Sequence, residues 1–525
     1  MQCPDIINDI FQYIIRAHSN KRDAHRVNKR GRWQRPLEKM TVSYHRYLSV
    51  IAADLRGIVA PELQSGRAKA ALAAAVRTLG RLAYLMDPAV DTLGIGEISD
   101  LPESIRIAFE SALAEAGMVN RAWRPAAQDP PEDISFRQPL APAMAVAAEW
   151  LKSADWSRSV QLRATAASLV AWDRGLLGES ETRSNELEEP VTSGPSATKM
   201  MEIDRAKLEH YLQKRFAQHA GVRIIEFLQV AGGRSKQTAV FTLEGVPELP
   251  QRLVVRRDHP IGIGMSVVKE FPAIARAHRE GMKVARPFFV EPARDVLGGS
   301  FAVAECVRGR VPTDYWDCPK SERLALSLAE QLAKLHAIDY SELSTSLDCS
   351  IDLKSNHPWL DDLDRLDAIV TRMGNAPSMI MGAAFGWMRQ NIDVVTSRLS
   401  LVHADAHFHN IHVEGEEFVA LLDWELVHIG HPVEDLGYCR PVVEKMTTWS
   451  RFMDAYVASG GVAPAQPEVD YFTLREIIRL ITMLLPARNL VQDGSLKDVL
   501  IAEIGTDFIN RLVYRLSEAL QGVLR

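Results

Sequence analysis

Two neighbouring stretches decide the fold: Leu401-Val-His-Ala-Asp-Ala-His-Phe-His-Asn410 and then Val419-Ala-Leu-Leu-Asp-Trp-Glu425. Asp405 and Asn410 stand in a polar loop, and Asp423 follows a short apolar strand after an intervening turn. A hairpin at that turn would bring the three side chains together. Two carboxylates and an amide oxygen are hard ligands that suit Mg²⁺ carrying substrate phosphates. A carboxylate that does not bind the metal can orient a hydroxyl and accept its proton.

This spacing resembles the catalytic loop and metal loop of the kinase-like fold. It is most similar to the aminoglycoside phosphotransferase and choline kinase superfamily, whose usual run is H-G-D-x-H-x-x-N followed by (I/L)-D-(W/F)-E. The resemblance implies ATP and Mg²⁺, with Asp405 as the catalytic base and Asn410 and Asp423 as the metal ligands. His403 belongs to the same catalytic set and braces the loop backbone. Ala404 replaces the family's glycine, and alanine lacks the freedom of glycine to take a positive φ.

A glycine-containing run lies upstream, between two strand-like segments. Its backbone can approach a nucleotide's phosphates closely, although it is not a Walker P-loop, because G-x-x-x-x-G-K-[ST] is absent. The residues assigned to nucleotide binding in this run are Gly232, Gly233, Arg234 and Ser235.

A cation on the next strand is the candidate for holding the α- and β-phosphates. Arg256 lies in Leu253-Val-Val-Arg-Arg257, and Glu270 follows on an apparent helix. In the family that this sequence resembles, a strand cation holds the phosphates and a helix glutamate orients it. Arg257 would point to the opposite face of the strand.

Two further motifs resemble the family in order and spacing. Phe301-Ala-Val-Ala-Glu305 looks like the strand that leads into the interlobe hinge, so the backbone of Glu305 and Val307 would meet the adenine edge. Gly430-His-Pro-Val-Glu-Asp-Leu436 resembles G-D-P-x-x-D-L, with His431 in place of the first aspartate. The resemblance implies that Asp435 braces the catalytic loop.

The acceptor is expected to be a small molecule bearing a hydroxyl. The Asp-Trp-Glu-Leu run and the Gly-Arg after the hinge look most like the subgroup associated with acyl-CoA dehydrogenases, which implies a hydroxyacyl-CoA or a related hydroxy acid. Residues 341–398, where the substrate-binding helices should lie, depart from that subgroup's pattern.

The chain of 525 residues is too long for one core. We expect an α+β protein: a bilobal protein-kinase-like fold, with a small β-rich N-lobe and a large helical C-lobe, preceded by an all-α N-terminal domain. The expected boundaries are a helical domain of unknown role over 1–178, a linker over 179–199, the nucleotide-binding N-lobe over 200–310 and the C-lobe over 311–525. The N-terminal domain could support a homodimer or bind a partner protein.

Composition narrows the class of protein. A net charge of −6 argues against nucleic acid as a partner, and no apolar run reaches the roughly 20 residues that span a bilayer. Five scattered cysteines favour reduced thiols and a cytoplasmic location. Two alternatives to the kinase stay open: a metallohydrolase built on His407, His409 and His412, and a catalytically weak pseudokinase or binding module.

Overall fold

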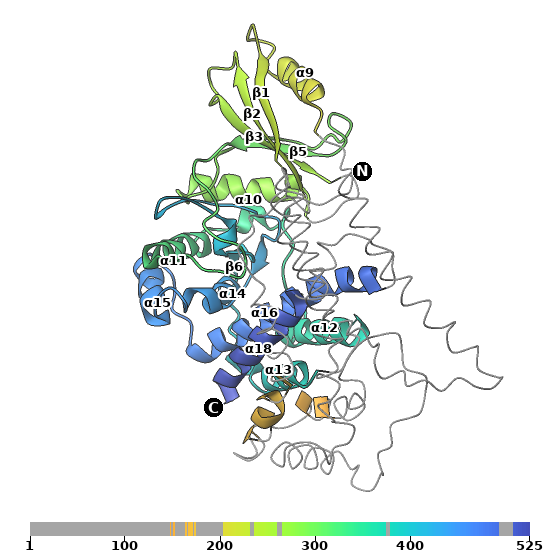
Figure 1. Ribbon diagram of the computed structural model, residues 1–525, viewed down its shortest axis with the longest axis vertical. Helices are drawn as coiled ribbons and strands as arrows, with labels where there is room; N and C mark the ends of the chain where they lie inside the picture. Colours follow the sequence, from red (N-terminus) through yellow and green to blue (C-terminus); the bar gives the residue numbers. More distant parts are fainter. Residues whose placement is uncertain are drawn as a thin grey trace, which may run out of the picture.

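The chain forms a lobe with a twisted sheet above a larger helical lobe (Figure 1). The computed structural model describes residues 203–230, 236–259, 265–373, 378–492 and 508–524, with short helical pieces between residues 147 and 174. The expected α+β architecture with a sheet-containing lobe and a helical lobe is therefore confirmed. Several predictions lie outside the described residues: those for Gly232, Gly233, Arg234 and Ser235, for residues 1–146 and for the linker over 179–199.

The small lobe is a five-stranded antiparallel sheet with the order β1-β2-β3-β5-β4. Helix α9 begins after Asp204, whose carboxylate accepts from the backbone N–H groups of Ala206 and Lys207. Leu208 and Leu212 then pack on one face of the sheet. The elements are α9 (Arg205–Arg215), β1 (Arg223–Val230), β2 (Lys236–Glu244), β3 (Arg252–Asp258), α10 (Val267–Arg279), β4 (Pro287–Glu291) and β5 (Phe301–Glu305).

Alternation along β3 separates its two faces. Leu253 and Val255 are fully buried against α9, and Arg257 follows them on the same face. Arg256 points to the other face, toward α10 and the helical lobe. The sequence pattern predicted this division, and the structure confirms it.

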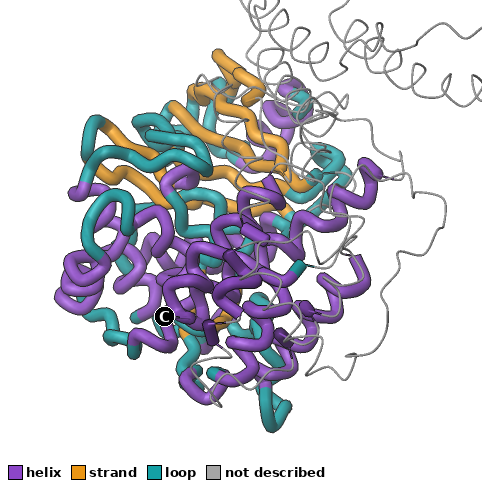
Figure 2. Tube along the Cα trace, turned by 60° about the horizontal axis from the view of Figure 1, so that its bottom comes forward, coloured by secondary structure: helices purple, strands orange, loops and turns teal. Residues whose placement is uncertain are grey.

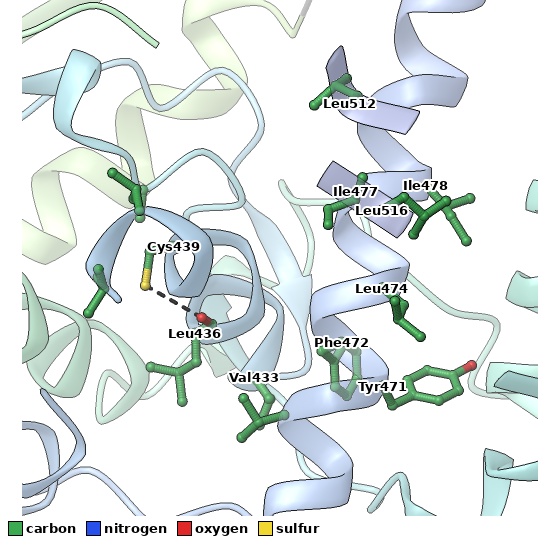
Figure 3. Close-up of a cluster of buried hydrophobic side chains, with 14 of the residues drawn as sticks. Val433, Leu436, Cys439, Tyr471, Phe472, Leu474, Ile477, Ile478, Leu512 and Leu516 are labelled. Carbon is green, nitrogen blue, oxygen red and sulfur yellow. Dashed lines mark hydrogen bonds between the residues drawn. The ribbon is translucent and has the colours of Figure 1, made fainter. Parts of the chain in front are cut away.

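Helices make up most of the large lobe. In Figure 2 they are purple, and most of the orange strands gather in the other lobe. α14 and α18 both contact α16, and Figure 3 shows their apolar side chains meeting in the core. The helices are α11 (Glu322–His336), α12 (Pro358–Met373), α13 (Met379–Gln390), α14 (Val433–Val443), α15 (Trp449–Ala458), α16 (Gln466–Gln492) and α18 (Ile509–Leu524), with short 3₁₀ turns at Ser341–Leu343, Ile392–Val394 and Phe408–Asn410.

Two small antiparallel ladders hold the loops that carry the predicted catalytic and metal-binding residues. Their strands are β6 (Ser400–Val402) paired with β9 (His428–Gly430), and β7 (Ile411–Glu414) paired with β8 (Glu417–Leu421). The β7–β8 pair is the predicted hairpin, and Gly415 in its turn has a φ of 63°. The loop after β6 and the residues after β8 are thereby brought to one place.

Part of the region expected to be a separate N-terminal domain packs on the helical lobe. Leu151, Leu169 and Val170 are fully buried in the core of that lobe. Gly382 of α13 allows the close approach, because an added Cβ would lie 2.4 Å from the backbone oxygen of Ala148. The predicted domain boundaries themselves stay predictions.

Within the described ranges, none of the helices combines the length and apolar content needed to span a bilayer. Four cysteines in these ranges are free thiols: Cys306, Cys318, Cys349 and Cys439.

Candidate active site

The loop after β6 is fixed by a buried carboxylate on α14. Asp435 accepts hydrogen bonds from the backbone N–H of His403 at 2.9 Å and of Ala404 at 2.7 Å, and from Nε2 of His336 at 3.1 Å. Burial by itself would raise the pKa of Asp435, but the hydrogen bond from His336 and the nearby imidazoles outweigh it and lower this pKa. Asp435 therefore stays ionised and clamps the loop, in the position that the sequence predicted.

Ala404 has a φ of 63°, in the left-handed region. This is the residue that replaces the family's glycine, and the hydrogen bonds that the loop donates to Asp435 hold it there. A left-handed conformation costs an alanine roughly 1–2 kcal/mol. The loop thus keeps the glycine-type backbone without the glycine.

His403 joins the loop to the strand beyond it. Its ring is fully buried, Nδ1 accepts from the backbone N–H of Asp405 at 3.2 Å, and Nε2 contacts the backbone oxygen of Leu422 at 3.0 Å. Burial lowers the pKa of His403, so the ring is neutral, with Nε2 as the donor. Both nitrogens are occupied by backbone groups, which is the geometry of a brace and not of a proton carrier.

Asp405 lies under Tyr438, whose hydroxyl donates to Oδ1. The amide of Asn410 donates to Oδ2 at 2.8 Å and to the backbone oxygen of Asp405 at 3.0 Å. Burial, together with the charge of Asp423, raises the pKa of Asp405 to about 7, although both hydrogen bonds act in the opposite direction. A carboxylate with such a pKa is poised to accept a proton near neutral pH.

Asn410 and Asp423 flank the hairpin. The backbone N–H of Leu422 donates to the backbone oxygen of Asn410 at 2.8 Å, which ties the end of the loop to the residue before Asp423. Asp423 has a φ of 61°, so the chain turns sharply there. Because the Asn410 amide nitrogen is already bound by Asp405, its carbonyl oxygen is the atom left for a ligand. An amide oxygen and a carboxylate are a donor set that fits Mg²⁺.

Arg256 connects the two lobes. Its guanidinium donates to Oδ1 of Asp423 at 2.8 Å and lies 3.6 Å from Oε1 of Glu270, which confirms the predicted pairing of Arg256 with the helix glutamate. Burial opposes the charge on Arg256, but Glu270 and Asp423 outweigh it and raise its pKa. Arg257, on the other face, is buried and donates to the backbone oxygen of Leu297.

The predicted hinge lies between β5 and the helical lobe. The backbone N–H of Glu305 donates to the oxygen of Arg286 at 2.9 Å, so it is not available to a nucleotide. Among the described residues, no backbone partner binds the N–H of Val307, which leaves it to meet a ligand. Arg310 and Val413 then exchange two backbone hydrogen bonds, which tie the hinge to the β7–β8 hairpin.

Sequence reasoning missed the side chains that support the loop from a distance. Arg479 of α16 donates to the backbone oxygen of Ala404 at 2.6 Å. One turn earlier, Arg475 donates to Glu434 of α14 at 2.8 Å and to Asp362 of α12 at 2.9 Å, all three being buried. Nothing local in the sequence marks these long-range partners. Tyr438 could have been found, since it follows Asp435 at helical spacing.

In the described part of the chain, the histidines do not form the metal site that the metallohydrolase alternative requires. His407 and His409 share a hydrogen bond between their Nδ1 atoms at 2.9 Å, and the ring of Tyr315 stacks on His407. Over the described ranges, no group of three or more His, Cys, Asp and Glu side chains is arranged to hold a metal ion.

Residues 226–472 match the phosphotransferase enzyme family. Acyl-CoA dehydrogenase family member 11 of Mus musculus is 27% identical over 251 residues, which is 45% of this chain and 31% of that protein. The chain thus matches about a third of the length of this curated relative.

Among solved structures, part of this chain is similar to macrolide 2'-phosphotransferase MphH from Brachybacterium faecium, at 17% identity and a TM-score of 0.40, covering 55% of this chain and 93% of that one. Another is spectinomycin phosphotransferase in complex with ADP and spectinomycin, at 13% identity and a TM-score of 0.42, covering 60% of this chain and 99% of that one.

Proposed function

We propose that this protein is an ATP-dependent small-molecule kinase that transfers the γ-phosphoryl group to a substrate hydroxyl, a proposal supported by the match of residues 226–472 to the phosphotransferase enzyme family. The observation that carries the proposal is the convergence of Asp405, Asn410, Asp423 and Arg256 from three separate elements. Each supplies a group that phosphoryl transfer needs.

Asp405 would act on the acceptor. Its carboxylate would accept a hydrogen bond from the attacking hydroxyl, orient the oxygen toward the phosphorus and take the proton as the new P–O bond forms. Tyr438 and Asn410 hold the two carboxylate oxygens, so the base is oriented before substrate arrives. Preorganisation of this kind accounts for most of the rate in phosphoryl transfer, where positioning dominates.

Asn410 and Asp423 would hold Mg²⁺, which when bound would neutralise charge on the phosphate oxygens. Arg256, oriented by Glu270, would bind the α- and β-phosphates, and Gly232, Gly233, Arg234 and Ser235 would cover them. The backbone N–H of Val307 would meet the adenine edge. Asp435 and His403 would keep the catalytic loop in place without touching substrate.

The acceptor is a small hydroxyl-bearing molecule, for which hydroxyacyl-CoAs and hydroxy acids are the first candidates. The test is a panel of hydroxyl-bearing metabolites screened for ATP-to-ADP conversion with Mg²⁺. Asp405→Asn keeps the shape of the side chain, so it should retain nucleotide binding by calorimetry while turnover falls by about a thousandfold or more. Unchanged turnover in this variant would remove Asp405 from the role of base.

A further inference from the structure

A second cluster of side chains lies beside Asp405 and takes no part in the proposed transfer steps. Tyr315, on the segment after the hinge, stacks on His407 with ring centroids 4.8 Å apart, and Trp316 meets Tyr315 edge to face at 4.9 Å. Phe508 contacts both rings. His407 in turn lies against Tyr438, the residue that donates to Asp405. The cluster is therefore an aromatic wall one residue away from the proposed base.

Helix α18 places a guanidinium on this wall. The charged end of Arg515 lies 5.1 Å from the ring centre of Trp316 and 5.6 Å from that of Tyr315. Cation–π contact of this kind holds a guanidinium against the rings but uses none of its N–H donors. Over the described part of the chain, Arg515 makes no hydrogen bond and no ion pair. The group is partly exposed, so its N–H donors are open to a ligand.

Two arginines of α16 near the site, Arg479 and Arg475, are engaged differently from Arg515. Arg479 is bound to Glu476 and to the backbone oxygen of Ala404. Arg475 is held by Asp362, Glu434 and Glu476. Arg515 thus differs from Arg479 and Arg475, because it contacts aromatic rings and keeps its N–H donors unused. A planar guanidinium with unused N–H donors can bind two oxygens of one carboxylate or phosphate.

We propose that Arg515 selects the acceptor, by binding an anionic group on the same molecule that presents its hydroxyl to Asp405. The aromatic wall formed by Tyr315, Trp316 and Phe508 would pack on the carbon skeleton between the two groups. The inference rests on the proposed kinase function. It adds a specificity-determining residue on α18, which lies outside the matched residues 226–472.

Matched pairs of compounds test the inference by binding, independently of turnover. The carboxylate pair is 3-hydroxyhexanoate and its methyl ester, and the phosphate pair is glycerol 3-phosphate and glycerol. Each is titrated by calorimetry into the full-length protein with Mg²⁺ and ADP. At least one anion should bind about tenfold or more tightly than its neutral partner. Which pair responds distinguishes a carboxylate from a phosphate as the recognised group.

Three variants locate the effect. Arg515→Met should remove the preference for the anion, and Arg515→Lys should restore only part of it, because lysine keeps the charge and loses the fork. Arg451→Met removes an exposed arginine of α15 that pairs with Glu322 of α11, so it controls for net charge and should change nothing. Equal binding of anion and neutral partner, or a preference that survives Arg515→Met, overturns the inference. Failure of ATP-to-ADP conversion would instead count against the proposed function.

Discussion

Arg256 of the small lobe and Asp423 of the large lobe are joined at 2.8 Å, between Nη2 and Oδ1. The bond places a proposed phosphate-binding cation on a proposed metal ligand. Asp423 is also 37% exposed, so its carboxylate can exchange this partner for others. We expect the two residues to separate, or to share a new ligand, when a nucleotide with its metal enters between the lobes.

Replacing Arg256 should weaken nucleotide binding more than it affects the chemical step. Arg256→Met removes a charged contact to phosphate, for which we expect a loss of about tenfold or more in affinity for ATP. It also leaves Glu270 buried without its cation, and burial already raises the pKa of that carboxyl. Calorimetry with ADP and Mg²⁺ measures the affinity, and Arg256→Lys should recover part of it. Unaltered affinity in Arg256→Met would show that the phosphates bind elsewhere.

Tyr438 should set the pH at which the enzyme becomes active. A base works in its ionised form, and burial raises the pKa of Asp405 to about 7, so activity should rise with pH through that region. The hydrogen bond from Tyr438 lowers this pKa. Tyr438→Phe removes the bond, so the midpoint of kcat/KM for ATP should move to higher pH. In Tyr471→Phe, which alters another buried phenol of the core, the midpoint should stay in place. A shift to lower pH in Tyr438→Phe would contradict the assignment.

Much of the site could be predicted from local sequence, because its residues are close along the chain or alternate on one strand. Asp405, Asn410 and Asp423 belong to one loop and hairpin, whose spacing alone predicted their meeting. Arg256 and Arg257 are neighbours, and strand alternation sent them to opposite faces. These relations follow from backbone geometry within a few residues.

Other parts of the site depend on tertiary packing that no local pattern encodes. Arg479 reaches the oxygen of Ala404 from 75 residues away. Arg515 comes from α18, far along the chain from Tyr315. Its cation–π contact with Tyr315 forms only when α18 packs against the segment after the hinge. Strand β4 was also missed: its sequence Pro-Phe-Phe-Val-Glu is short, has no clear alternation, and pairs only with β5 at the edge of the sheet.

The left-handed backbone of Ala404 should make the protein more stable when glycine is restored. Ala404→Gly relieves the positive φ but removes a buried methyl group, for which we expect a net gain of up to about 1 kcal/mol in unfolding free energy. Ala406 is the matched control: it is equally buried, two residues away, and has no positive φ. Ala406→Gly should therefore lose about 1 kcal/mol, because it removes a buried methyl group and makes the unfolded chain more flexible. Urea unfolding of both variants measures the difference. Equal losses of unfolding free energy would show that the backbone of Ala404 is not strained.

His431 occupies the position where the family has an aspartate, and its surroundings have adapted to an imidazole. Nδ1 accepts from the backbone N–H of Val433 at 3.3 Å, at the start of α14, as a carboxylate oxygen would. Nε2 lies 3.3 Å from Oε1 of Glu468 and 3.0 Å from the Thr396 hydroxyl, and the ring stacks on Phe472. The imidazole thus accepts a hydrogen bond at the start of α14 and pairs with Glu468 of α16.

Restoring the family's residue should therefore destabilise this protein. His431→Asp would bury a second carboxylate beside Glu468, which is itself 1% exposed, and would remove the stacking on Phe472. We expect a loss of about 3 kcal/mol in unfolding free energy, the cost of leaving a buried charge unpaired. Adding Glu468→Gln to His431→Asp removes the repulsion and should recover a measurable part of the loss, whereas Glu468→Gln alone should destabilise the wild type. Thermal or urea unfolding of the two single variants and the double variant measures this coupling. Additive effects would mean that His431 acts through packing alone and not through its pairing with Glu468.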